Sequence, residues 1–253
     1  MKKTFLAAAA MAMMAFVSCK KDKAPDLSPV TPGKLLTKLT KKEGNKTTVF
    51  NFVYDNNKRL VSYKSTDNLV GILFTYDAAG NVTKVEDTED DYRNVYTYAY
   101  KNNIPVSGSF KSWQKTAGEP ESLIEDDQLS YTITSNQVSK IHVSFLQSGD
   151  AADFGLTYNS DGNLAKISSA VGGYSASFGY GTKKPVYPMV SRYILDQAGF
   201  SLQFAARNEL LTLSYDFPGT QYDQSVSTQY TYDADGYALT STDGISQIKY
   251  EYQ

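Results

Sequence analysis

The chain has 253 residues, 25 Lys and Arg against 27 Asp and Glu, and a formal net charge of −2 at pH 7. This mild acidity, without a basic cluster beyond the first part of the chain, argues against nucleic acid as a partner. A single cysteine excludes an intramolecular disulfide, and a single histidine excludes metal sites of the His/Cys type.

The first 18 residues have the organisation of a secretory signal peptide. A basic start at Lys2 and Lys3 precedes an apolar run over 5–17, and the small residue Ser18 stands at the expected cleavage point. The run is too short for a membrane-spanning helix. A buried N-terminal helix is the alternative, but a polar, proline-bearing tract follows immediately. We therefore expect residues 1–18 to be a signal peptide.

Cys19 follows this cleavage point directly. The stretch FVSC at 16–19 resembles the lipobox of bacterial lipoproteins, and together with the following KKDK it resembles the signals of Bacteroidetes-type outer-membrane lipoproteins. The resemblance implies that Cys19 is lipidated and anchors the protein to the outer membrane, facing the periplasm or the cell surface. Acyl chains contribute about 0.8 kcal/mol per buried methylene, so an anchored domain needs no spanning segment.

Residues 19–33 form a tether between the anchor and the rest of the chain. The segment contains three prolines and several charges and almost no apolar residues. Such a composition cannot bury enough surface to order itself. The folded domain is therefore expected over 34–253, a length that single all-β domains often reach.

A short phrase recurs along this domain. TYDAAGNVTKV at 75–85 and TYNSDGNLAKI at 157–167 match closely, and TYDADGYAL at 231–239 keeps the turn. Weaker copies are VYDNNKRL at 53–60, AYKNNIPV at 99–106, GYGTKKPV at 179–186, TITSNQV at 132–138 and FAARNELL at 204–211. A period near 24 residues indicates one supersecondary unit per repeat.

The turn residues predict that each unit is a β-hairpin. Asp77 can accept a nearby backbone N–H, and Gly80 can take the left-handed position that closes a bulged hairpin. The flanking residues are β-branched, aromatic, Thr or Ser, which favours strands. We therefore predict an all-β fold, a single antiparallel up-and-down meander of about sixteen strands, strongly curved or closed into a barrel.

The Tyr-Asp-x-x-Gly-Asn-Val/Leu phrase resembles the YD repeats of Rhs-type and teneurin proteins. With the signal, the lipobox and the tether, the chain also resembles a family of Bacteroidetes lipoproteins of unknown function with a porin-like fold. Both resemblances imply a scaffold of hairpins and bring no catalytic residue. A membrane-spanning pore is not expected, because RLVSYKST at 59–66 and NVTKVED at 81–87 lack an apolar face of sufficient length.

The longest repeat interval contains the segment 112–128, which we interpret as an inserted loop. It carries the only tryptophan and five acids. An aromatic ring beside acids is typical of sites that stack a sugar ring or hold calcium, whereas acid runs are more often merely solvated. The candidate ligand-binding residues are Trp113, Glu119, Glu121, Asp126 and Asp127, with Glu125 among the acids. A second loop, 216–224, offers Phe217 and Tyr222, to which we assign a structural role.

Catalytic residues are not expected. The single histidine, His142, alternates with apolar residues in SKIHVSF and reads as a solvent-side strand residue. No Gly-x-Ser-x-Gly elbow presents a serine, and an acylated Cys19 is no nucleophile. We expect no cofactor and no metal.

The sequence thus predicts a membrane-anchored, non-catalytic binding or scaffolding module at the cell envelope. Its candidate ligands are a carbohydrate or a partner protein. Two alternatives stay open: a carboxylate-dependent hydrolase acting from 112–128, which needs two carboxyls roughly 5–10 Å apart, and a small-molecule carrier with a hollow barrel. The packing of the inner face separates scaffold from carrier.

Overall fold

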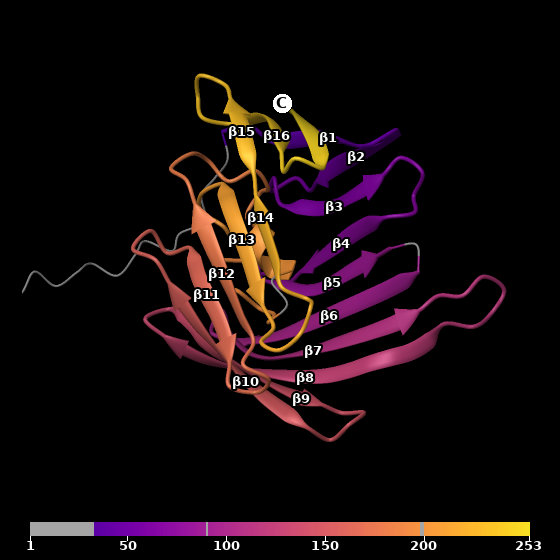
Figure 1. The fold of residues 1–253 in the computed structure, drawn as a ribbon, viewed down its shortest axis with the longest axis vertical. Coiled ribbons are helices and arrows are strands. Elements are labelled where there is room, and N and C mark those ends of the chain that lie inside the picture. The colour runs from indigo at the N-terminus through magenta and orange to yellow at the C-terminus, as the bar shows by residue number, and fades with distance from the viewer. Residues whose placement is uncertain (1–32, 90, 198–199) are drawn as a thin grey trace, which may run out of the picture.

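The computed structural model describes residues 33–89, 91–197 and 200–253, which form one antiparallel sheet (Figure 1). The all-β meander is confirmed, and these residues contain seventeen strands and one 3-10 helix, η1 (Phe200–Phe204). The signal peptide, Cys19 and nearly all of the tether lie outside the described residues. The strands are β1 (Leu36–Glu43), β2 (Lys46–Tyr54), β3 (Leu60–Ser65), β4 (Gly71–Tyr76), β5 (Val82–Thr88), β6 (Tyr92–Lys101), β7 (Ile104–Gln114), β8 (Ser122–Thr134), β9 (Gln137–Phe145), β10 (Ala151–Tyr158), β11 (Leu164–Ser169), β12 (Ser175–Tyr180), β13 (Leu210–Asp216), β14 (Gln224–Ser227), β15 (Gln229–Tyr232), β16 (Ala238–Thr242) and β17 (Ser246–Tyr252).

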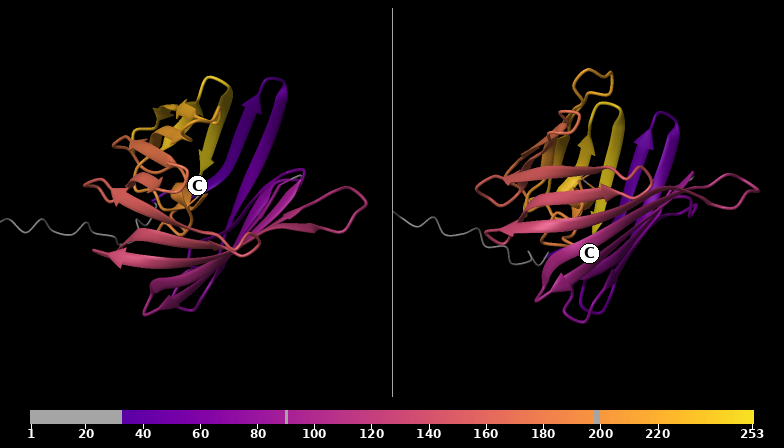
Figure 2. Two further views of the ribbon diagram at one scale, coloured as in Figure 1. Left: turned by 60° about the horizontal axis from the view of Figure 1, so that its bottom comes forward. Right: turned by 90° about the horizontal axis from the view of Figure 1, so that it is seen from below.

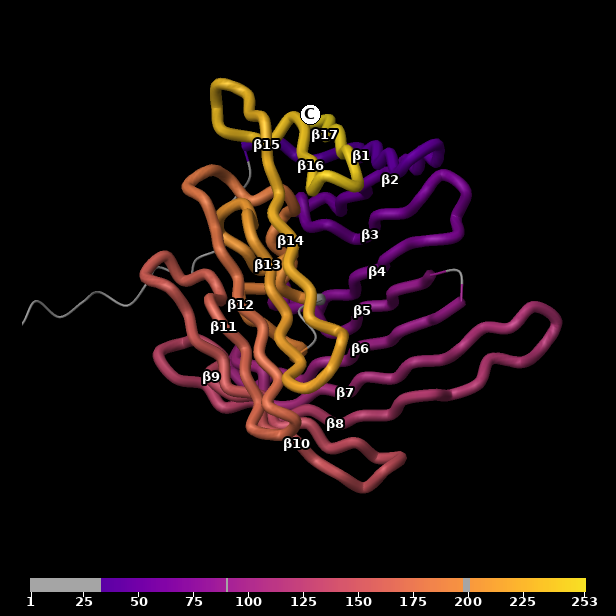
Figure 3. Tube along the Cα trace, in the orientation of Figure 1, coloured from indigo at the N-terminus to yellow at the C-terminus, as the bar shows by residue number. Residues whose placement is uncertain are grey.

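The sheet curves into a nearly closed barrel (Figure 2). Strands that are neighbours in sequence pair antiparallel from β1 to β14 and from β15 to β17, and β1 also pairs with β17. β14 and β15 form one continuous extended run, visible in Figure 3, whose first part pairs with β13 and whose second part pairs with β16. The sheet is therefore closed by a single run that changes partners midway.

The hairpin turns follow the predicted chemistry at one end of the barrel. The Asp233 carboxylate accepts the N–H groups of Asp235 and Tyr237, both at 2.9 Å, and the Asn159 side-chain oxygen accepts the corresponding pair. Gly236 adopts a φ of 81°, the left-handed conformation that closes the bulge. These local bonds fix each turn without help from the rest of the fold.

The recurring tyrosines also link successive hairpins at this end, which we call the tyrosine end. In three of them the hydroxyl group donates to a backbone carbonyl near the start of a strand in the preceding hairpin unit. A buried hydroxyl needs such a partner, and tyrosine supplies it while its ring joins the core. The bonds join Tyr54 to Leu36 (2.8 Å), Tyr76 to Leu60 (2.6 Å) and Tyr158 to Val138 (2.9 Å).

We expect Tyr158→Phe to lower the free energy of unfolding by about 1 kcal/mol, because the substitution removes one hydrogen bond and leaves the ring in place. Urea unfolding followed by circular dichroism measures the change. Tyr222→Phe is the matched control, since the Tyr222 side chain is exposed. Equal stability of the two variants would show that the hydroxyl link contributes nothing.

Two of the proposed repeats are not hairpins, and here the sequence interpretation was wrong. Residues 179–186 and 204–211 stand at the two ends of a single long connection between β12 and β13, and these two strands pair with each other. Tyr180 faces Leu210 across the same bulge that ends the other hairpins. The two frames are thus the two halves of one hairpin, whose turn is replaced by the segment 181–209.

The described residues of this segment, 181–197 and 200–209, pack into the interior of the barrel at the tyrosine end, and we call them the plug. Tyr193, Ile194 and Leu195 are buried in the same core cluster as the inner faces of the strands. The hydroxyl group of Tyr131 on β8 donates to the carbonyl of Leu195 at 2.8 Å. The packed plug therefore occupies interior space at the tyrosine end that the hollow-barrel alternative requires to be empty.

The outer face of the barrel carries ion pairs. Lys84 and Glu86 on β5 are joined at 2.9 Å, and Lys38 on β1 reaches Glu251 on β17 at 3.1 Å. Lipid-facing strands need an apolar band in such positions, so the outer face fits contact with water. No helix among the described residues has the length and apolar content needed to cross a membrane.

Candidate functional site

The segment 112–128 is not an inserted loop. Its residues extend β7 and β8, which are 11 and 13 residues long, and only 115–121 connects them in the hairpin that projects at the right of Figure 1. Strand alternation therefore sends neighbouring side chains to opposite faces of the sheet. The five predicted ligand residues are consequently distributed over three places.

Trp113 and Glu121 lie together on the outer face. The guanidinium of Arg93 stacks on the Trp113 ring, 4.1 Å from its centroid, and its Nη2 donates to Glu121 Oε2 at 2.6 Å. The hydrogen bond from Arg93 holds the pKa of Glu121 below its ordinary value. Glu119 stands apart in the exposed connection. Trp113 and Glu121 both already have Arg93 as a partner, so a ligand role for these two residues stays a prediction.

Asp126 and Asp127 point in opposite directions. Asp126 faces outward and binds Lys111 Nζ at 2.8 Å, whereas Asp127 faces the barrel interior and is only 1% exposed. Asp127 alone of the five predicted residues reaches the interior. On β9, the exposed His142 contacts Asp153 at 2.8 Å through Nδ1, which confirms its solvent-side position.

A pocket of about 600 Å³ opens at the end of the barrel opposite the tyrosine end, which we call the open end. It lies where β9, β11 and β13 finish and β10, β12 and β14 begin. Phe217 and Tyr222, which the sequence assigned a structural role, are part of its lining. The lining also includes Phe145, Phe154, Tyr174 and Tyr215, with Ala152, Ser169, Val171, Gln197 and Gln224.

The rings of this pocket hold one another in place. Tyr174 packs against Phe217 with centroids 5.2 Å apart and meets Phe154 edge-on at 6.1 Å. Burial raises the pKa of Tyr174 to about 12, so its hydroxyl stays neutral and can donate or accept a hydrogen bond. Gln197 from the plug adds an amide to the lining. The arrangement offers ring faces with a few polar groups, which is typical of small-molecule sites.

The adjoining wall of the interior, on β5 to β8, is acidic. Asp87 pairs with Asn94, Asn94 with Ser112, and Ser112 with Glu125, so these four side chains form a row across four strands. Burial, followed by the nearby Glu89, raises the pKa of Asp87 to about 6. This row could not be predicted from the sequence, because its four residues are far apart in the chain and only the register of the strands brings them side by side.

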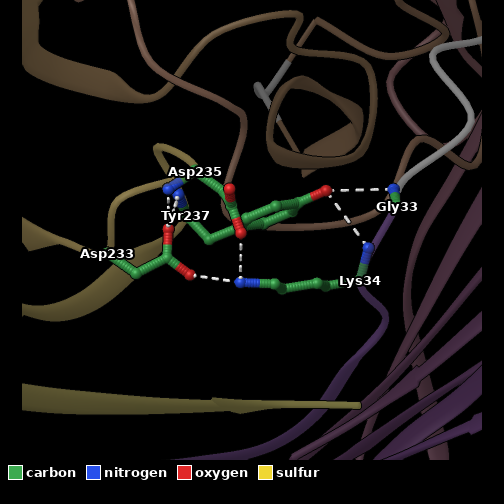
Figure 4. A network of polar contacts seen from close by, with 5 residues as sticks. All are labelled: Gly33, Lys34, Asp233, Asp235 and Tyr237. Atoms are coloured by element: carbon green, nitrogen blue, oxygen red, sulfur yellow. Dashed lines mark hydrogen bonds and ion pairs between the residues drawn. The ribbon is translucent and has the colours of Figure 1, made fainter.

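The described chain begins at the tyrosine end. The Tyr237 hydroxyl accepts the N–H groups of Gly33 and Lys34 at 2.9 and 3.1 Å, and Lys34 Nζ lies 2.7 Å from Asp233 and 2.8 Å from Asp235 (Figure 4). The hydrogen bonds to Asp233 and Asp235 hold the pKa of Lys34 above its ordinary value. The chain therefore enters the barrel at the end opposite the aromatic pocket.

No protein-family model and no curated protein match this sequence. Among solved structures, a porin-like protein from Bacteroides uniformis ATCC 8492 is 14% identical, with a TM-score of 0.49, over 89% of this chain and 99% of that chain. A porin-like protein from Bacteroides vulgatus ATCC 8482 is 11% identical, with a TM-score of 0.45, over 87% and 99%. The TcdB2-TccC3 structure is 12% identical, with a TM-score of 0.20, over 82% of this chain and 16% of that chain. The structural neighbours of the chain thus include porin-like proteins from Bacteroides.

Proposed function

We propose that this chain is a lipid-anchored lipoprotein of the outer membrane whose barrel, built of Rhs-like YD hairpins, is a non-catalytic binding module. The observation that carries the proposal is the aromatic pocket at the open end. The nearly closed sheet supports it, and the plug forms part of its lining. Sites held by regular elements keep their geometry better than sites on loops.

The lining of the pocket favours a small ring-shaped ligand, and a carbohydrate is the class that we propose. Tyrosine and phenylalanine faces provide flat apolar surface for a sugar ring, while the amides of Gln197 and Gln224 provide donors and acceptors for its hydroxyls. A pocket of about 600 Å³ has the size of ordinary small-ligand sites. A segment of a partner protein is the weaker candidate, because the pocket is a local concavity rather than a long groove.

The position of the proposed anchor fits this role. Lipidated Cys19 would be joined through residues 20–32 to Gly33, which hydrogen-bonds to Tyr237 at the tyrosine end. The pocket lies at the other end of strands such as β10, which runs for 8 residues. The proposed anchor would therefore attach at the tyrosine end and leave the open end accessible to solutes.

The hydrolase alternative is less well supported, although one observation favours it. Burial and a hydrogen bond with Glu125 raise the pKa of Asp127, as general acids require. However, the two carboxyls contact each other directly, whereas glycoside hydrolysis needs them roughly 5–10 Å apart to flank the scissile bond. We therefore propose binding without turnover, and we expect no product release from a bound oligosaccharide.

Lipid anchoring predicts that cells fed a labelled fatty acid incorporate the label into this protein through Cys19. Cys19→Ser should abolish the label and move the protein from the outer-membrane fraction to the soluble fraction. Ser18→Ala, one residue earlier, is the control and should keep both. Labelling that survives Cys19→Ser would rule out this anchor.

The pocket is tested with a glycan array and titration calorimetry on the best hit. We expect Tyr174→Ala to weaken binding at least tenfold, which corresponds to about 1.4 kcal/mol, because it removes the ring at the centre of the cluster. Trp113→Ala, on the outer face, should leave the affinity unchanged. If Trp113→Ala abolished binding and Tyr174→Ala did not, the site would lie on the outer face instead.

A further inference from the structure

The acidic wall lies next to the aromatic pocket on the inner face of the sheet. Phe145 lines the pocket and is also the ladder partner of Asp127 on β8. On its other side Asp127 pairs with Phe110, and Phe110 stacks against Tyr96 with centroids 4.7 Å apart. A carboxyl therefore stands in a row of aromatic rings that leads out of the pocket.

One carboxylate oxygen of Asp127 can accept a hydrogen bond that no residue in the described part of the chain donates. Its side chain is 1% exposed, and among the described residues its Oδ2 has no hydrogen-bond partner. Burying a polar atom without a partner is costly, and native structures rarely keep such atoms without a functional reason. A donor that reached Asp127 Oδ2 would relieve this cost.

The electrostatic field of this region is acidic. Burial raises the pKa of Tyr96 on one wall and of Tyr174 on the other, and the charge of Asp196, on the plug, is among those that raise both further. Asp87 and Glu125 add two carboxyls from the polar row. A cation is the charge-complementary occupant.

We propose that the pocket ligand carries a protonated amine, and that this organic ammonium group binds at the Glu125 and Asp127 carboxyls between the rings of Phe110 and Phe145. The inference rests on the proposed binding function and specifies its ligand class. Glu125 is partly exposed and forms the accessible member of the pair. An ammonium group supplies the donors that Asp127 lacks, and the flanking rings attract a cation through their faces.

An organic cation fits the wall better than a metal ion. Within the described ranges, no group of three His, Cys, Asp or Glu side chains is placed to hold a metal. Calcium needs six to eight oxygen ligands, whereas an ammonium group needs two or three acceptors. The aromatic rings beside the acids also suit an organic cation rather than a hydrated ion.

Binding should also release a proton. Burial raises the pKa of Asp127, and Glu125 and Asp126 raise it further. On the neighbouring strands Lys111 faces outward to Asp126, and His142 faces outward to Asp153, so neither neutralises Asp127. An arriving ammonium group replaces the proton of this carboxyl as its partner.

The test compares the affinities of two ligands, the trisaccharide of glucosamine, which has free amines, and its fully N-acetylated counterpart. Both are measured by calorimetry on the full chain at pH 6. We expect the amine form to bind at least tenfold more tightly and to release protons, as measured in two buffers of different ionisation enthalpy. Asp127→Asn should equalise the two affinities and abolish proton release. Asp126→Asn, which removes the adjacent outward carboxyl, should preserve the difference.

Equal binding of the two trisaccharides by the unsubstituted chain would overturn the ammonium site and leave the pocket proposal standing. Binding of neither would overturn the ammonium site, while the glycan array would still decide the pocket. Competition by calcium at micromolar concentration would also overturn it, in favour of a metal site. If Asp127→Asn does not fold, Glu125→Gln on the partly exposed partner provides the same test.

Discussion

Replacing Phe204 by alanine is expected to lower the free energy of unfolding by about 3–5 kcal/mol. Phe204 is 2% exposed at the end of η1 and joins the plug to the barrel wall. Its ring packs against Phe74 on β4 at 5.1 Å, Tyr187 of the plug at 5.5 Å and Tyr63 on β3 at 6.1 Å. Truncation would leave a cavity among rings that cannot close around it.

Urea unfolding of the purified protein measures this change. Leu69→Ala provides the control, because Leu69 is half exposed in a connection and should cost less than about 0.5 kcal/mol. A loss at Phe204 no larger than at Leu69 would mean that the plug does not pack inside the barrel. The result bears on the pocket as well, since Gln197 of the plug lines it.

Stability is expected to fall as the pH rises from about 5 through about 7. Burial raises the pKa of Asp127 from its ordinary value to about 7 and that of Asp87 to about 6. The folded state therefore holds protons that the unfolded chain releases, and the unfolding free energy decreases as these carboxyls ionise in place. Acids with lowered pKa, such as Asp77 and Asp153, lose their contribution only at lower pH.

Unfolding midpoints in urea at pH 5, 6, 7 and 8 test this dependence. Asp127→Asn should flatten the decline and raise the stability at pH 8 relative to the unsubstituted protein, because the amide cannot ionise in the buried position. Asp126→Asn should retain most of the slope, because Asp126 pairs with Lys111 on the outer face and is the smallest contributor to the raised pKa of Asp127. A slope unchanged by Asp127→Asn would place the buried proton elsewhere.

The hairpins were predictable because their information is local. An Asp or Asn that accepts two backbone N–H groups, followed by a glycine with positive φ, fixes the turn within five residues, as at Asp233 and Gly236. Alternation then assigns the faces of each strand. Ile248, Tyr250 and Tyr252 point inward on β17 as expected, because their neighbours are polar.

The plug was not predictable in the same way. The sequences around Gly179-Tyr180 and just before Leu210 each resemble a complete hairpin repeat, although they are the two sides of one hairpin. The apolar residues between them, such as Ile194 and Leu195, follow neither a strand nor a helix period. Their burial is set by the space that the other strands enclose, and this information is not local.

The site was hidden for a related reason. The acids of 112–128 suggested a solvated loop, and their separation to opposite faces followed only once β8 was known to be a strand. The six pocket rings come from five elements and connections, none of which has a local sequence that indicates a site. Phe217 alone could have indicated the pocket from the sequence. A large apolar residue in a polar segment such as 216–224 indicates a contact beyond its own hairpin.

The plug occupies the place of a hairpin turn, and this has a consequence for how the interior can vary. Tyr180 and Leu210 keep the register of an ordinary hairpin, so the sheet would close equally well around a shorter or longer excursion between them. The strands thus determine the circumference of the barrel wall, whereas the plug determines the volume left for a ligand inside it. Replacing the connection between Tyr180 and Leu210 by a different segment would change what fills the interior while leaving the barrel wall unchanged.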